Sequence, residues 1–141
     1  MRSGLTTALV SMLCLVACGG STTTPTPVYP AVAGTWGGTI QTGNAGTVTA
    51  QFTLAQSNSL VSGIWSSPAG WKGTVSGTVA TSGSFSGVVT ISTPNADGTT
   101  CSGSGSFGGA FTTGRFSAAS NGFTGDCANL PNDVNVLTQR Q

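Results

Sequence analysis

Few side chains in this sequence could carry acid–base or nucleophilic chemistry. The chain has no histidine, so a Ser-His-Asp arrangement cannot form. Its three acidic residues are Asp97, Asp126 and Asp133, and each stands beside Gly, Cys or Asn in a segment typical of turns. The single lysine, Lys72, is expected to point outward from a strand, where it is a poor activator for a nucleophilic serine. The sequence therefore does not predict an enzyme.

One segment gathers oxygen atoms of the kind that calcium prefers. The acidic and amide residues of "GDCANLPND" are Asp126, Asn129, Asn132 and Asp133. Carboxylate and amide oxygens bind calcium, but this spacing matches no established calcium loop. We expect a turn rich in Asp and Asn, with a calcium site as the weaker alternative. No cofactor and no other metal are expected.

The first 17 residues are predicted to be a signal peptide. Arg2 supplies a short positive region, and an apolar stretch follows from Leu5 to Ala17. As a helix this stretch would span about 20 Å, too short for a bilayer core of about 30 Å. A cleaved export signal fits better than a permanent transmembrane helix.

The end of that stretch, "LVAC" with Cys18 last, resembles the lipobox of bacterial lipoproteins. The resemblance implies a lipid on the Cys18 thiol, cleavage before Cys18, and removal of Cys14 with the signal. Two or three acyl chains hold a protein durably on a membrane. The next residue is Gly19 rather than aspartate, which in the family implies the outer membrane; another envelope membrane is the alternative. An ordinary secretory signal is the competing interpretation.

Residues 18–33 are predicted to be the lipidated N-terminus and a tether. They are rich in Gly, Ser, Thr and Pro and show no hydrophobic period. Pro25, Pro27 and Pro30 disfavour helix and central strand. This composition is typical of a flexible or extended linker, so the folded domain is expected to occupy residues 34–141.

Two cysteines, Cys101 and Cys127, remain in the predicted mature domain. In an oxidising envelope, two cysteines of a small domain normally pair. A zinc site would need four ligands, and a catalytic thiol would lack a histidine base. We therefore expect a structural disulfide.

From residue 34 onward, apolar and hydroxyl residues alternate. In "TVTAQFTLA", Val48, Ala50, Phe52 and Leu54 share one face and the hydroxyl side chains share the other. This alternation predicts half-buried antiparallel strands. Turn residues separate eight of them, at 34–41, 46–56, 59–66, 71–80, 84–92, 99–111, 115–120 and 133–139. The fold class is predicted to be all-β, an eight-stranded meander closing as a small up-and-down barrel, with a β-sandwich as the alternative.

Two features of the pattern leave alternatives open. Phe111 and Phe116 differ in parity, so the seventh strand is the least secure. Glycines recur on the predicted inner face, at positions 73, 77, 87, 103 and 105. They allow strands to approach closely, and they are compatible either with a small ligand cavity or with a flattened, tightly packed barrel.

The "GTW" at residues 34–36 opens a Gly/Thr-rich meander and resembles the first-strand signature of the lipocalin and avidin superfamily. The resemblance extends to about residue 111. It implies that Trp36 closes one end of a barrel, beneath a basic side chain from a late strand, either Arg115 or Arg140. No biotin site carries over, because no further set of polar contacts matches.

Two further tryptophans, Trp65 and Trp71, flank the loop "SSPAG". They could form an aromatic platform for a sugar or a peptide, or they could plug the barrel end. Together with Trp36 and Arg115 they are the candidate ligand-binding residues.

Charge excludes some partners and leaves others. Only 5% of residues are charged, and the bases beyond the predicted signal are too few and scattered to neutralise phosphates, so nucleic acid is not expected. We expect a lipid-anchored envelope protein whose barrel is a non-catalytic module binding a small apolar ligand, a glycan or an envelope protein. A structural spacer is the alternative, and an enzyme a distant third.

Overall fold

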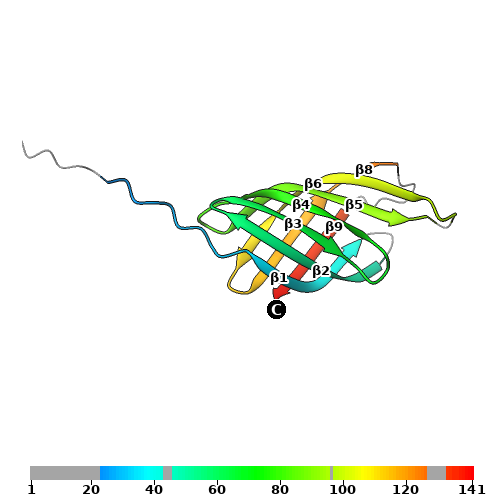
Figure 1. Cartoon of the computed structure of the whole chain (residues 1–141), viewed down its shortest axis with the longest axis horizontal. Helices are drawn as coiled ribbons and strands as arrows, with labels where there is room; N and C mark the ends of the chain where they lie inside the picture. The colour runs from blue at the N-terminus through cyan, green and yellow to red at the C-terminus, as the bar shows by residue number, and fades with distance from the viewer. Residues whose placement is uncertain (1–22, 43–45, 96, 127–132) are drawn as a thin grey trace, which may run out of the picture.

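The chain folds into one antiparallel β-sheet that closes into a barrel (Figure 1). The structure, a computed structural model, describes residues 23–42, 46–95, 97–126 and 133–141. Its strands are β1 (Gly34–Thr42), β2 (Gly46–Ser57), β3 (Leu60–Ser66), β4 (Lys72–Val79), β5 (Ser84–Pro94), β6 (Thr100–Thr112), β7 (Arg115–Asn121), β8 (Thr124–Gly125) and β9 (Asp133–Arg140).

The barrel closes through the last strand. Each strand from β1 to β7 pairs with the next along the chain, and β9 pairs with both β7 and β1. Eight strands therefore form a closed antiparallel ring, while the short β8 pairs only with β6. The predicted small up-and-down barrel is confirmed, and the sandwich alternative does not hold.

The predicted strands agree with the observed ones to within two residues at every end. The seventh strand is present, and the difference in parity has a simple cause. Phe111 of β6 lies directly opposite Phe116 of β7, with Thr113 and Gly114 in the turn between the strands. A hairpin turn of two residues places the flanking pairs on the same face, so both phenylalanines point inward. The sequence did not predict β8.

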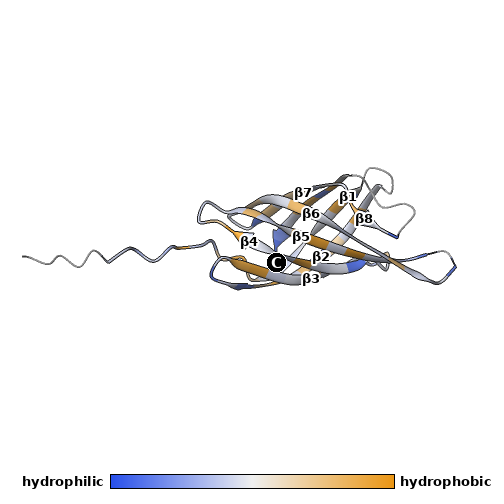
Figure 2. Cartoon of the chain, turned by 90° about the horizontal axis from the view of Figure 1, so that it is seen from above, coloured by the Kyte–Doolittle hydropathy of each residue, from blue (hydrophilic) through white to orange (hydrophobic). Residues whose placement is uncertain are grey.

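Burial follows the predicted alternation. The inward side chains of every barrel strand form a continuous hydrophobic core, and the outward ones are mostly Ser and Thr. Phenylalanine rings fill the barrel beside Trp36: the ring centroids of Phe111 and Phe116 are 4.1 Å apart, and Phe85 meets both rings edge to face. Figure 2 shows few strongly hydrophilic segments on the barrel.

Two inner-face glycines allow β4 and β5 to approach each other closely. Gly77 and Gly87 are register partners. A Cβ built on Gly77 would lie 2.7 Å from the Cα of Gly87, and one on Gly87 would lie 2.8 Å from the Cα of Gly77. Real Cβ atoms do not approach this closely, so the backbone geometry requires glycine at both positions.

The barrel has two different ends. Residues 23–33 run into β1 from one end, here called the tether end, and the first of them, residues 23–28, extend away from the barrel (Figure 1). At the other end, here called the cavity end, the β5–β6 hairpin projects beyond the barrel (Figure 1). There β6 leaves β7, and its residues Gly103 and Ser104 pair with β8 instead.

Candidate functional site

The tether end is closed by Trp36 and the chain that precedes it. The Trp36 side chain is 1% exposed, and its Nε1 donates a hydrogen bond to the carbonyl oxygen of Val32 at 2.9 Å. Val32 is itself fully buried and belongs to the hydrophobic core. The last part of the predicted tether is therefore packed as part of the domain.

Arg140 covers this closure. Its Cζ lies 5.9 Å from the centroid of the Trp36 ring, a cation–π distance. Its Nη2 donates to the carbonyl oxygen of Ala33 at 2.6 Å, and its Nη1 to that of Ala31 at 3.4 Å. Of the two arginines considered from the sequence, Arg140 is the one over Trp36. Arg115 is exposed near the start of β7, opposite Gln139.

Gln56 holds the same segment from the side of β2. Its Oε1 accepts a hydrogen bond from the backbone nitrogen of Val32 at 2.7 Å. Its Nε2 donates to the carbonyl oxygens of Pro30 and Asn58, both at 3.0 Å. Sequence reasoning missed this role, because Gln56 lies 26 residues from Pro30 along the chain.

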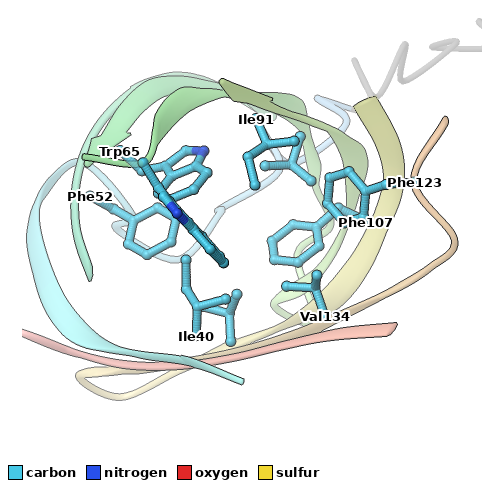
Figure 3. A pocket seen from close by; sticks show the side chains of 10 residues that line it. Ile40, Phe52, Trp65, Ile91, Phe107, Phe123 and Val134 are labelled. Atoms are coloured by element: carbon cyan, nitrogen blue, oxygen red, sulfur yellow. The ribbon is translucent and has the colours of Figure 1, made fainter. Parts of the chain in front are cut away.

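The interior towards the cavity end contains one small cavity of about 20 Å³ (Figure 3). Its lining is entirely apolar and consists of Ile40, Phe52, Trp65, Trp71, Val89, Ile91, Phe107, Phe123, Val134 and Val136. A volume of this size holds about one water molecule, and apolar cavities stay dry. Binding sites for small molecules typically measure about 300–1,000 Å³. The interior is therefore packed, the second of the two alternatives left open by the inner glycines.

The tryptophans beside the "SSPAG" loop both contribute to this interior. Trp65 is 4% exposed, stacks on Phe52 with ring centroids 6.1 Å apart, and donates from Nε1 to the carbonyl oxygen of Thr90 at 3.0 Å. Trp71 is half-buried and packs against the core at the cavity end. They line one cavity and do not form an exposed platform.

Two buried hydroxyl groups lie among the apolar side chains. The Oγ of Ser120 and the Oγ1 of Thr138 have no hydrogen-bond partner among the residues that the structure describes. Thr138 lies opposite Phe116, and Ser120 lies opposite Val134 towards the cavity end. They are separate polar atoms and do not converge on one point. Sequence reasoning missed both, because serine and threonine dominate the outer face.

Asp97 is a turn residue. Its Oδ1 accepts hydrogen bonds from the backbone nitrogen of Thr99 at 2.9 Å and from the Thr99 hydroxyl at 2.6 Å. These bonds, the hydroxyl bond first, hold the pKa of the Asp97 carboxyl below its ordinary value. The carboxylate fastens the tip of the β5–β6 hairpin, as its position before Gly98 suggested.

The predicted calcium ligands are only partly within the described residues. Asp126 is exposed, and its Oδ1 accepts from the Ser102 backbone nitrogen at 2.5 Å and from the Ser102 hydroxyl at 3.4 Å. Asn129 and Asn132 lie outside the described residues, and Asp133 begins β9. Across the described ranges, no three His, Cys, Asp or Glu side chains are grouped as metal ligands would be.

The predicted disulfide and lipid attachment also reach beyond the described residues. Cys101 is buried on β6, whereas Cys127 and Cys18 lie outside the described part of the chain. The hydrogen bonds between Asp126 and Ser102 bring the chain next to Cys101 just before position 127. The pairing of Cys101 with Cys127 stays a prediction, with this geometry in its favour.

The outer surface carries an aliphatic face, defined here by Leu60 and Ile64 of β3 and Val88 of β5. Their side chains are 61%, 63% and 46% exposed. A groove of about 670 Å³ runs beside them, lined by Ala55, Gln56, Ser57, Leu60, Val61, Ser62, Ser76, Gly77, Thr78, Gly87 and Val88. The register explains it: the small outward side chains of Ser62 and Ser76 are paired across β3 and β4.

Comparisons with models of protein families, with curated proteins and with solved structures find no match to this chain. Within the described ranges, no helix has the length and hydropathy required to cross a bilayer.

Proposed function

We propose that this chain is a lipid-anchored protein of the bacterial cell envelope whose barrel is a non-catalytic interaction module acting through its outer surface. One contrast carries the proposal: the apolar interior leaves about 20 Å³, whereas the outer groove offers about 670 Å³. A small apolar ligand held inside the barrel is therefore the version least supported, and a partner on the outside is the version most supported.

The anchor is proposed on the "LVAC" motif, and the described structure is compatible with it. Residues 23–28 extend away from the barrel at one end, so the described part of the chain leaves the domain without crossing the outer groove. Gly19 favours the outer membrane as the destination. The exit of the chain at one end leaves the sides of the barrel free for contacts.

Substitution of the predicted lipidation site tests the anchor. Cys18→Ser should abolish acylation, seen as the loss of the diacylglyceryl and acyl mass, and should shift the protein from the membrane to the soluble envelope fraction. Cys14→Ser is the matched control, because Cys14 would be discarded with the signal and its change should leave both readouts unaltered. A mature protein that carries no lipid on Cys18 would overturn the proposal.

A structural spacer is the second candidate, supported by the nearly uncharged, hydroxyl-rich outer surface and the packed interior. A chimera tests it, in which residues 1–33 carry an unrelated barrel of similar size. The chimera should restore the envelope permeability of a deletion strain if only spacing matters. It should fail if the surface of this barrel makes specific contacts.

A further inference from the structure

The aliphatic face is the largest departure from the hydroxyl-rich surface of the barrel. Outward positions on strands of this kind are expected to be polar, yet Leu60, Ile64 and Val88 are all about half exposed or more. Leu60 and Val88 line a groove of about 670 Å³, and Ile64 lies on the same outer face of β3, beyond the lining of the groove. Grouped exposed aliphatic side chains indicate contact with a protein or a membrane.

The charge of this side of the barrel is compatible with a lipid surface. In β2, β3, β4 and β5 as the structure describes them, Lys72 is the one ionisable side chain. It lies at the cavity end of β4 and is positive, so no carboxylate repels anionic headgroups. The Asp97 carboxylate lies in the turn between β5 and β6, and the Asp126 carboxylate follows β8 and accepts from Ser102 of β6; Leu60 begins β3 at the tether end.

The exit of the tether places one end of the groove near the proposed anchor. Gln56 lines the groove and also holds Pro30 and Val32 through hydrogen bonds. From Pro30 back to Cys18, the fully extended chain reaches at most about 40 Å. The barrel is therefore held within that distance of the bilayer, and even a weak contact is made at a high effective concentration.

A second copy of the chain is a poorer occupant. The face spans the three strands β3, β4 and β5, about 14 Å, and five residues along β3, about 17 Å. That is roughly 240 Å² on each copy, less than a third of the roughly 800 Å² per partner that stable interfaces bury. A contact with a membrane that already holds the protein through a lipid anchor does not need a buried area of that size.

We propose that the aliphatic face is the surface with which the barrel lies against the phospholipid bilayer that carries its anchor. This inference rests on the proposed acylation of Cys18. In this orientation the barrel lies on its side, with β3 against the headgroups and Leu60 and Ile64 reaching between them. The opposite side, including β7, faces away from the membrane.

Quenching by brominated lipids tests the orientation. The mature acylated chain is reconstituted in vesicles of phosphatidylethanolamine and phosphatidylglycerol with brominated acyl chains, at few proteins per vesicle. Two reporters are compared, Ile64→Trp and Leu137→Trp, with the unsubstituted chain as the background. Leu137 is a matched position, because it is 58% exposed on β9, outside the aliphatic face. The indole at position 64 should be quenched several-fold more strongly than the indole at position 137.

A second variant tests the contact itself. Adding Leu60→Ser and Val88→Ser to the Ile64→Trp chain should remove most of the quenching, since both side chains are exposed and their replacement leaves the core intact. Equal quenching at positions 64 and 137, or none at either, would overturn the inference. A dimer in detergent that Leu60→Ser abolishes and Leu137→Ser retains would assign the face to a second copy and also overturn it.

The two proposals fail in different ways. Intact mass measured before reconstitution reports acylation of Cys18. If the chain carries no lipid on Cys18, the proposed anchor is wrong. If the chain is acylated but the two positions are not quenched differently, the anchor stands and only the proposed orientation is wrong.

Discussion

At the scale of single residues, the barrel depends on side chains that tie distant parts of the chain together. Trp36, Arg140 and Gln56 hold the segment before β1 through five hydrogen bonds, and Arg140 also lies over the Trp36 ring. Gln56 and Arg140 are far from that segment in the sequence, whereas Trp36 is four residues from Val32. Local patterns can indicate that Trp36 closes the barrel, but they cannot say which arginine lies above it, because that depends on the register of the last strand.

Arg140→Ala should destabilise the protein, and Arg115→Ala should not. Arg140 makes two hydrogen bonds to backbone carbonyl oxygens and lies over the Trp36 ring, whereas Arg115 is an exposed strand residue. Because Arg140 is exposed to solvent, we expect a loss of only about 1–2 kcal/mol. Denaturant unfolding measures both variants. Equal midpoints for the two would show that the Arg140 contacts do not contribute.

The Asp97 carboxyl should titrate below its ordinary value. Its pKa is lowered by the Thr99 hydroxyl and then by the Thr99 backbone nitrogen, and Thr99→Val removes the larger contribution while keeping the shape. Carboxyl NMR titration should give a higher Asp97 pKa in Thr99→Val than in the natural chain. Because the folded pKa is depressed, the stabilisation is present above the unfolded pKa and is lost as pH falls through the folded pKa. An unchanged Asp97 pKa in the variant would contradict the role of the hydroxyl.

At the scale of elements, the period of two in the sequence was enough to predict every strand of the barrel. It predicts which face is buried because a strand alternates its side chains strictly. It could not predict β8, since two residues have no period. Nor could it predict the groove, because Ser62 and Ser76 become neighbours only through the pairing of β3 with β4. A pattern along one strand contains no information about its partner's register.

Gly77→Ala and Gly87→Ala should each cost more than 2 kcal/mol of stability, given the overpacking that an added methyl would cause. Each new Cβ would lie within 3 Å of backbone atoms in the facing strand. Gly108→Ala is the control, because its Cβ would meet only the carbonyl oxygen of Phe85, at 4.0 Å. In thermal unfolding, the midpoint temperature should fall in Gly77→Ala and Gly87→Ala but not in Gly108→Ala. Equal effects at all three positions would exclude close approach as the reason for Gly77 and Gly87.

At the scale of the whole molecule, the interior is packed, so specific binding of a partner would involve the outer surface or the tether. The sequence could place the glycines inside, but it left open whether they surround a cavity. Packing decides that question, because rings such as Phe85, Phe111 and Phe116 come from three strands and fill the same volume. The outer face could be predicted to be polar but not to carry the aliphatic face.

Reduction should weaken the whole fold if Cys101 and Cys127 pair. A bridge between them closes a loop of about 27 residues, and on the chain-entropy model it contributes roughly 3–4 kcal/mol. The intact mass of the reduced protein should exceed that of the oxidised protein by two hydrogen atoms, and the reduced form should unfold at a lower denaturant concentration. Cys101→Ser in a background of Cys127→Ser should then be insensitive to reductant. Identical masses before and after reduction would exclude the bridge.

The packing of Val32 beneath Trp36 also determines how the protein responds to force. A pull on the N-terminal segment acts first on the hydrogen bonds from Arg140 of β9, Gln56 of β2 and Trp36 of β1, which fasten that segment to the barrel. The force then acts along β1. The hydrogen bonds that pair β1 with β2 and β9 are perpendicular to this force, so many of them bear it together. The barrel therefore meets tension on its N-terminal segment in shear, the direction in which a sheet is strongest.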